Sequence, residues 1–188
     1  MKIRNKKFVY LISPNKIIGN SFFNSLNLVL KSNKVSFFQL RLKKESKNRK
    51  IEIAKKIQKI CVKNDVKFII NDDPYLALKL RADGCHLGQK DVDIKIAKKI
   101  LKNKIIGITC HNSILLAKKA FINGASYVAI GAFNKSNTKK IIHKANIETL
   151  KKIKKSVNLP IVAIGGINEN NYKKLLLNKA DFLAISGY

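Results

Sequence analysis

Residues 67–91 read KFIINDDPYLALKLRADGCHLGQKD and combine two strand-like runs with a helix between them. The run 67–71 is almost continuously apolar, which is typical of a strand buried on both faces. Pro74 marks the start of a helix, and the next apolar run occupies 83–87. Parallel neighbouring strands need a crossover connection, which is usually a helix, so this stretch predicts a β-α-β unit of a parallel sheet.

The same alternation recurs along the whole chain. Further strand-like runs lie at 7–13, 35–41, 104–109, 126–132, 160–165 and 181–186. Between them apolar residues return at helical spacing, for example Ile51, Ala54 and Ile57. Alternation alone allows a doubly wound sheet, but eight strands favour a closed (β/α)8 barrel, the TIM barrel. We therefore expect one compact α/β domain over residues 1–188, with the last helix missing or vestigial.

Charge and cysteine content exclude several classes of protein. The formal charge is +28, but nearly all of the 39 basic residues are lysines scattered through every polar segment. Nucleic-acid binders gather their charge and add arginine or aromatic residues, so we expect no nucleic-acid partner and instead attraction of phosphorylated metabolites. No apolar run is long enough to span a membrane, and a cytoplasmic location is expected. The three cysteines lack the spacing of a disulfide framework or zinc site.

Polar residues gather at the expected carboxyl ends of the strands. Barrel enzymes carry their chemistry at this end, because the loops that follow the strands meet there. The candidate residues are Gln39, Arg41, Lys43, Asn71, Asp72, His86, Gln89, Asp91, Thr109, His111, Lys139, Gly166 and Ser186. Among the histidines, His86 lies in an apolar run and is expected to be a hydrogen-bonded interior residue rather than a catalyst.

The acids at these ends suggest a metal site. Only eleven acidic residues exist, yet Asp72 and Asp91 follow neighbouring strands. Mg²⁺ takes one or two carboxylates together with substrate phosphate oxygens. With Arg41, Lys43 and Lys139 on other strand ends, the pair suits a magnesium-diphosphate complex. The alternative is that these acids cap helices.

Capping is the expected role of two other acids, Asp73 and Asp93, which precede helix starts. The Gly165-Gly166 turn and Ser186 follow the seventh and eighth runs, where barrels frequently bind phosphate. A plain tight turn is the alternative for either position. Their occurrence at adjacent strand ends favours a phosphate site.

The ordered motifs resemble those of the thiamine phosphate synthase family from about residue 7 onward. The motifs are FFQLRLK, FIINDDPYLAL, ADGCHLGQKD, IIGITCH, SNTK, LPIVAIGGIN and ADFLAIS. The resemblance implies a Mg²⁺-dependent transferase that joins 4-amino-2-methyl-5-hydroxymethylpyrimidine diphosphate to a thiazole phosphate. Thiamine phosphate and diphosphate are the products, and the pyrimidine C–O bond breaks first through a carbocation-like species. A homo-oligomer is also possible, since family members commonly pair.

The resemblance also implies a role for each matching residue. Asp72 and Asp91 would hold Mg²⁺. The pyrimidine diphosphate would be bound by Gln39, Arg41, Lys43, Asn71, Thr109 and Lys139, among which Arg41, Lys43, Thr109 and Lys139 are the candidate catalytic residues. The thiazole phosphate would be bound by Ser136, Thr138, Gly166 and Ser186.

The chain departs from the family pattern at three places. The loop at 135–139 lacks the family's prolines, Thr109 replaces a common serine, and the eighth helix is not expected. Two alternatives remain: a thiazole tautomerase, or a non-catalytic barrel that binds phosphorylated ligands. The tautomerase's catalytic histidine would fall at Ala132, which favours the synthase.

Overall fold

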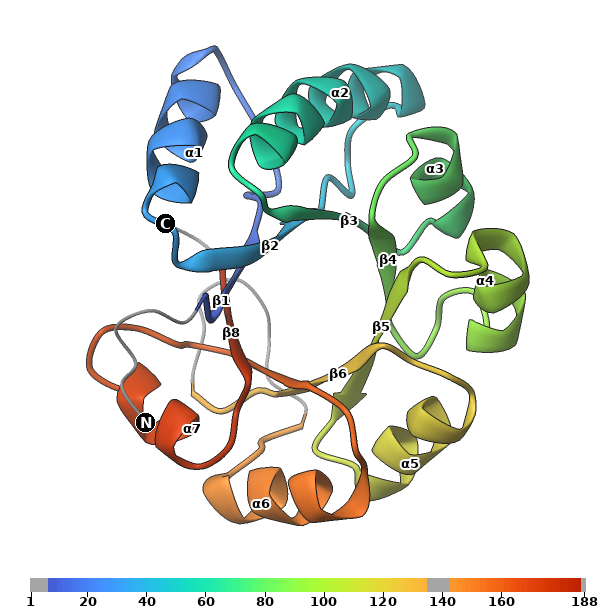
Figure 1. The fold of residues 1–188 in the computed structure, drawn as a ribbon, viewed down its shortest axis with the longest axis vertical. Coiled ribbons are helices and arrows are strands. Elements are labelled where there is room, and N and C mark those ends of the chain that lie inside the picture. Colours follow the sequence, from blue (N-terminus) through green and yellow to red (C-terminus); the bar gives the residue numbers. More distant parts are fainter. Residues whose placement is uncertain (1–6, 135–142, 187–188) are drawn as a thin grey trace.

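The computed structural model describes residues 7–134 and 143–186, in which eight parallel strands close into a barrel (Figure 1). The strands follow one another around the barrel in chain order, and β1 pairs with β8. They are β1 (Val9–Ile12), β2 (Val35–Leu40), β3 (Lys67–Asn71), β4 (Gly84–Leu87), β5 (Ile105–His111), β6 (Tyr127–Gly131), β7 (Ile161–Ile164) and β8 (Phe182–Ile185). The predicted barrel and all eight predicted strands are confirmed.

Seven helices surround the barrel in the described part of the chain. They are α1 (Ser21–Lys31), α2 (Lys47–Lys63), α3 (Pro74–Lys79), α4 (Ile94–Leu101), α5 (Ile114–Ile122), α6 (Ile147–Ser156) and α7 (Tyr172–Leu177). The two predicted caps are confirmed: Asp73 accepts a hydrogen bond from the Leu76 amide, and Asp93 accepts one from the Lys95 amide, each at 2.8 Å. The side chains of Asp73 and Asp93 therefore cap helices, whereas those of Asp72 and Asp91 are available for a site at the mouth of the barrel.

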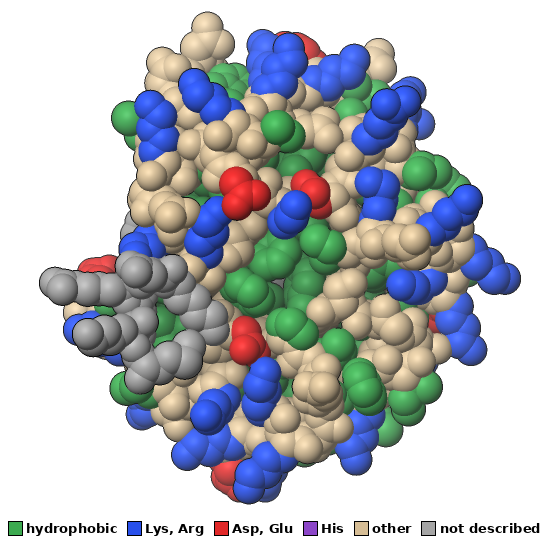
Figure 2. All heavy atoms as spheres, viewed as in Figure 1, with side chains coloured by type: hydrophobic (Ala, Val, Ile, Leu, Met, Phe, Trp, Pro, Cys, Tyr) green, Lys and Arg blue, Asp and Glu red, His purple; other side chains and the backbone are tan. Residues whose placement is uncertain are grey.

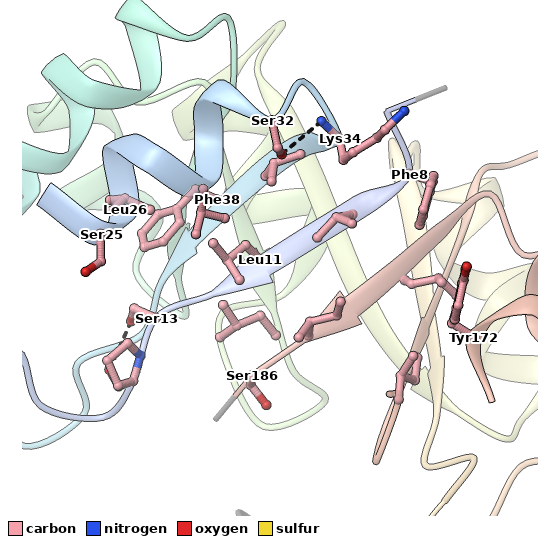
Figure 3. A pocket seen from close by; sticks show the side chains of 18 of the residues that line it. Phe8, Leu11, Ser13, Ser25, Leu26, Ser32, Lys34, Phe38, Tyr172 and Ser186 are labelled. Carbon is pink, nitrogen blue, oxygen red and sulfur yellow. Dashed lines mark hydrogen bonds between the residues drawn. The ribbon is translucent and has the colours of Figure 1, made fainter. Parts of the chain in front are cut away.

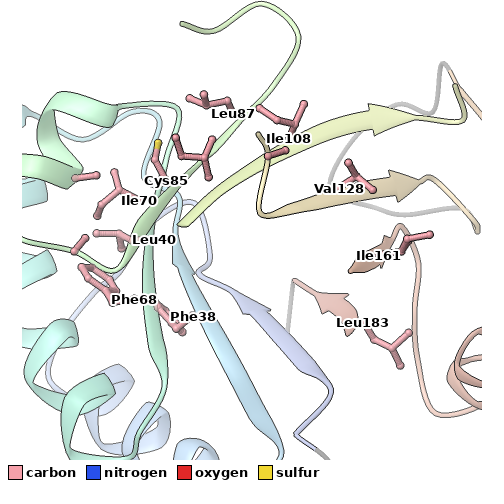
Figure 4. Close-up of a cluster of buried hydrophobic side chains, with 14 of the residues drawn as sticks. Phe38, Leu40, Phe68, Ile70, Cys85, Leu87, Ile108, Val128, Ile161 and Leu183 are labelled. Atoms are coloured by element: carbon pink, nitrogen blue, oxygen red, sulfur yellow. The ribbon is translucent and has the colours of Figure 1, made fainter. Parts of the chain in front are cut away.

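The core has two layers, because residues on each strand alternate between the inside and the outside of the barrel. Outward side chains such as Phe38, Phe68 and Ile70 pack beneath the helices (Figure 4). Inward side chains, among them Tyr10 and Tyr127, form a smaller cluster within the barrel. A strand buried on both faces is mostly apolar, which explains the nearly continuous apolar runs in the sequence. Gln39 and His86 are buried polar exceptions.

An apolar groove of about 510 Å³ runs along the outer face of β1 and β8 (Figure 3). Helices α1 and α7 lie on either side of these two strands (Figure 1). Leu11, Phe38 and Tyr172 line it, and Ser186 lies at one end. A helix that followed β8 would pack here in a full (β/α)8 barrel. Within residues 7–134 and 143–186, no helix follows β8 to cover this groove.

The basic side chains are spread over the surface. Seen along the barrel axis, Lys and Arg surround the rim of the molecule, and hydrophobic side chains occupy its centre (Figure 2). This face therefore carries no single basic patch of the kind that tracks a nucleic-acid backbone. Among the described residues, no helix has the length and apolar character required to cross a membrane. Cys61, Cys85 and Cys110 are buried and unpaired.

Candidate active site

Asp72 and Asp91 meet at the carboxyl ends of β3 and β4. Asp72 follows the last residue of β3 with a positive φ of 66°, and its amide donates to the His86 carbonyl oxygen at 2.8 Å. Asp91 lies in the turn after β4, where its Oδ2 accepts a hydrogen bond from the Gly88 amide at 2.6 Å. The two carboxyl groups lie close enough for the Asp91 carboxyl to raise the pKa of Asp72. The sequence separates these acids, and the barrel brings them into contact.

The environment of the acid pair suits a divalent cation. Burial, and then the neighbouring Asp91 carboxyl, raise the pKa of Asp72 above its usual range, whereas the nearby Lys43 ammonium lowers it. The Lys43 Nζ lies 3.2 Å from the Asp72 Oδ2. Two carboxylates in contact repel when both are ionised, and a hard cation with oxygen ligands relieves that repulsion. The residues therefore fit Mg²⁺.

Two acids would leave most of an octahedral coordination shell to other oxygens. Within residues 7–134 and 143–186, no group of three or more His, Cys, Asp or Glu side chains could hold a metal. Mg²⁺ usually keeps several waters and binds substrate phosphates alongside one or two carboxylates. The donor set thus fits a metal that arrives with a diphosphate better than a metal enclosed by protein.

Basic side chains border the acid pair. A cleft of about 250 Å³ beside the mouth is lined by Lys43, Lys50, Asn71 and Asp72, among others. On the neighbouring side, the Arg41 Nη1 donates to the Asn15 Oδ1 at 2.7 Å. The loop after β1 therefore holds this guanidinium at the rim, where its planar group can bind phosphate oxygens.

A glycine turn follows β7. Gly165 has a φ of 107°, and a Cβ on it would lie 2.6 Å from the Ala132 Cβ, so no other residue fits without rearrangement. Gly166 has a φ of 57°, and its carbonyl accepts a hydrogen bond from the Asn171 Nδ2 at 2.8 Å. Ser186 is exposed at the end of the adjacent β8. Exposed hydroxyl and backbone groups next to one another suit a phosphate.

A chain of hydrogen bonds crosses the barrel interior. The Gln39 Nε2 donates to the Tyr10 hydroxyl at 3.1 Å, and that hydroxyl lies 2.7 Å from the Tyr127 hydroxyl. The Tyr127 hydroxyl is 2.9 Å from the His86 Nδ1, and the His86 Nε2 is 2.9 Å from the Thr109 Oγ1. Burial lowers the pKa of His86 to about 4, so its imidazole is neutral near pH 7. The prediction of a hydrogen-bonded interior histidine is confirmed.

The structure brings most of the predicted site residues to one end of the barrel, although their roles stay predictions. Ser136, Thr138 and Lys139 lie outside the described residues. Sequence reasoning missed Tyr10, Tyr127 and Asn15, which hold predicted residues in place. A tyrosine inside an apolar run is a signal that could have been used, since a buried hydroxyl requires a partner.

A closed parallel barrel with an acid pair, basic side chains and a glycine turn at the carboxyl ends of its strands is typical of barrel enzymes that act on phosphorylated substrates. Residues 9–187 match the protein family described as thiamine monophosphate synthase. The chain belongs to this family.

The similar proteins carry the same description. The chain is 67% identical over 184 residues to a thiamine-phosphate synthase of Pelagibacter ubique, a match that covers 98% of this chain and 89% of that protein. A second thiamine-phosphate synthase, from Erythrobacter litoralis, is 41% identical over 95% of this chain and 86% of the relative. Among solved structures, a thiamine phosphate pyrophosphorylase from Pyrococcus furiosus superposes with a TM-score of 0.83 at 32% identity, covering 98% of this chain and 87% of that one.

Proposed function

We propose that the protein is a Mg²⁺-dependent thiamine-phosphate synthase. It joins 4-amino-2-methyl-5-hydroxymethylpyrimidine diphosphate to a thiazole phosphate and releases diphosphate. Family membership and the 67% identical relative support the activity. The observation that carries the proposal is the contact between Asp72 and Asp91 beside Lys43 at the mouth of the barrel. The proposed location is the cytoplasm, where the three unpaired cysteines stay reduced.

The first role of the site is to stabilise the leaving diphosphate. As the pyrimidine C–O bond breaks, negative charge grows on the departing oxygens, and fixed cations stabilise that charge more than they stabilise the substrate. Arg41 and Lys43 supply such cations among the described residues, and Lys139 is proposed as a third. Bound Mg²⁺, held by Asp72 and Asp91, would neutralise further charge on the diphosphate.

The second role is to position the two reactants. The Thr109 hydroxyl and the Gln39 amide lie at the two ends of the interior hydrogen-bond chain and are proposed to bind the pyrimidine diphosphate together with Asn71. Gly166 and Ser186, with Ser136 and Thr138, are proposed to bind the phosphate of the thiazole. Fixing the thiazole beside the pyrimidine lets its ring nitrogen attack the cationic carbon before water does.

Substitution of Asp91 tests the metal site. Asp91→Ala removes one proposed ligand and is expected to abolish Mg²⁺-dependent formation of thiamine phosphate from the two substrates, measured by chromatography. The matched control is Asp93→Ala, since Asp93 lies on the same loop but accepts a bond from the Lys95 amide. That variant is expected to lose about 1 kcal/mol of stability and to keep its turnover. Equal rates for both variants would refute the metal assignment.

The same assay separates the synthase from the alternatives. A thiazole tautomerase would isomerise its thiazole phosphate without consuming the pyrimidine diphosphate. A non-catalytic barrel would bind both compounds without product. Only the synthase releases diphosphate in proportion to thiamine phosphate.

A further inference from the structure

The interior hydrogen-bond chain contains three side chains that the proposed reaction leaves without a role. Gln39 and Thr109 occupy its ends, and Tyr10, Tyr127 and His86 connect them. Tyr10 and Tyr127 are each 2% exposed, so their hydroxyl groups have no access to bulk water. Buried polar groups must find their partners within the protein, and the chain provides them.

The chemistry of the groups gives the chain a direction. The Gln39 Nε2 can only donate, so the Tyr10 oxygen accepts there and its own hydrogen turns to Tyr127. The Tyr127 hydroxyl, having accepted, donates to the His86 Nδ1. A neutral imidazole that accepts at Nδ1 carries its proton on Nε2, and this N–H donates to the Thr109 Oγ1.

The last member of the chain then has a hydrogen to give. Because the Thr109 Oγ1 accepts from His86, the Thr109 hydrogen is not used within the chain and can be donated to a ligand. If the hydrogen bonds ran in the opposite direction, Thr109 would donate its hydrogen to His86, and its oxygen could only accept a hydrogen bond from a ligand. The proton position on one buried histidine thus decides whether Thr109 is a hydrogen-bond donor.

We propose that His86 is a positioning residue that makes Thr109 a donor to an acceptor atom of the pyrimidine diphosphate, and that Tyr10 and Tyr127 couple this donor to the orientation of the Gln39 amide. This inference rests on the proposed function for the identity of the ligand. It adds that two substrate-binding side chains from β2 and β5 are fixed together as one unit.

The packing around the chain is rigid enough for this role. A Cβ on Gly107 would lie 1.9 Å from the Tyr127 Cζ, so the tyrosine ring rests directly on the backbone of β5. Phe37 stacks on Tyr10 with ring centroids 5.3 Å apart. The Gln89 side chain donates to the Thr109 carbonyl oxygen and holds the backbone that carries the hydroxyl. A donor fixed before the ligand arrives costs little reorganisation when it binds.

The tautomer of His86 can be measured directly. The protein has three histidines, so ¹⁵N spectra of the imidazole rings are simple, and His86→Gln assigns the missing signal. The expected spectrum near neutral pH is that of a neutral ring protonated on Nε2. A ring protonated on Nδ1, or a charged ring, would reverse or break the chain and overturn the proposal. This measurement does not depend on activity, so it remains informative if the proposed reaction is wrong.

Kinetics tests whether the chain acts on the substrate. Tyr127→Phe keeps the ring but removes the central hydroxyl, and kcat/KM for the pyrimidine diphosphate is expected to fall about tenfold. The KM for the thiazole phosphate should stay within about twofold of the wild-type value. The reason is that Tyr127 is linked only to Gln39 and Thr109, the residues proposed to bind the pyrimidine diphosphate. Tyr172→Phe is the matched control, because Tyr172 packs against Phe8 outside the barrel. A purely structural role would lower the melting temperature and leave both kinetic constants of the folded enzyme unchanged, which would refute the proposal.

A pair of substitutions at His86 provides an independent test. Glutamine can accept from Tyr127 through its oxygen and donate to Thr109 through its nitrogen, whereas leucine can do neither. His86→Gln is therefore expected to recover most of the kcat/KM that His86→Leu loses. Equal losses in two folded variants would show that the donor sequence does not matter. If the wild type forms no thiamine phosphate at all, the proposed function fails, and the ¹⁵N spectrum alone decides whether the chain has the stated direction.

Discussion

Acidification should destabilise the protein through His86. Burial lowers the pKa of this imidazole from 6.5 to about 4 in the folded state, whereas the unfolded chain returns it to the ordinary value. The folded-state pKa is depressed, so the stabilisation is complete above pH 6.5 and is lost as the pH falls towards 4. At about 1.4 kcal/mol per pH unit, the full loss is about 3 kcal/mol.

Urea unfolding of the wild type and His86→Gln at a series of pH values isolates this contribution. The carboxylates titrate in both proteins, so the difference between the two curves reports the histidine. Between pH 7.5 and 4.5 the wild type is expected to lose about 2 to 3 kcal/mol more of its unfolding free energy than the variant. The variant should also be the less pH-dependent protein between these limits.

Parallel curves for the two proteins would refute this reasoning. They would mean that His86 has the same pKa in the folded and unfolded states. An imidazole with access to water would behave in that way, and the interior hydrogen-bond chain could not then be closed to solvent. A wild type that is less sensitive to acid than the variant would mean that the ring is charged in the folded protein.

Two further substitutions test the packing and the phosphate site. Gly107→Ala places a methyl group against the Tyr127 ring and is expected to destabilise the protein by about 3 kcal/mol, measured by urea unfolding; a change below about 1 kcal/mol would mean that the ring does not rest on β5. Ser186→Ala should raise the KM for thiazole phosphate more than the KM for pyrimidine diphosphate in steady-state kinetics, and equal increases would count against Ser186 as a phosphate ligand.

The fold could be predicted because a parallel barrel imposes a repeated pattern on the sequence. Each strand is buried on both faces, so it appears as a short apolar run, and the predicted runs match the observed strands to within about two residues at most ends. The acid pair could also be predicted from the sequence, because the carboxyl ends of all strands meet at one mouth of the barrel. Asp72 and Asp91 needed only their positions after β3 and β4 to be placed together.

The hydrogen-bond partners in the interior chain could not be predicted, because every strand is buried on both faces. In a run that is apolar on both faces, nothing indicates whether Tyr10 or Tyr127 points into the barrel or towards a helix. Their hydroxyl groups meet across 117 positions of sequence, a pairing that only strand tilt and register determine. The bond between Arg41 and Asn15 depends on the conformation of a loop, which no periodicity encodes.

Crystals grown with Mn²⁺ in place of Mg²⁺ and with pyrophosphate would test the proposed site most directly, because anomalous scattering identifies the metal. The expected result is one metal ion bound by carboxylate oxygens of both Asp72 and Asp91, with pyrophosphate oxygens completing its shell and Lys43 beside them. A metal ion bound elsewhere, or pyrophosphate bound away from the two acids, would contradict the proposal.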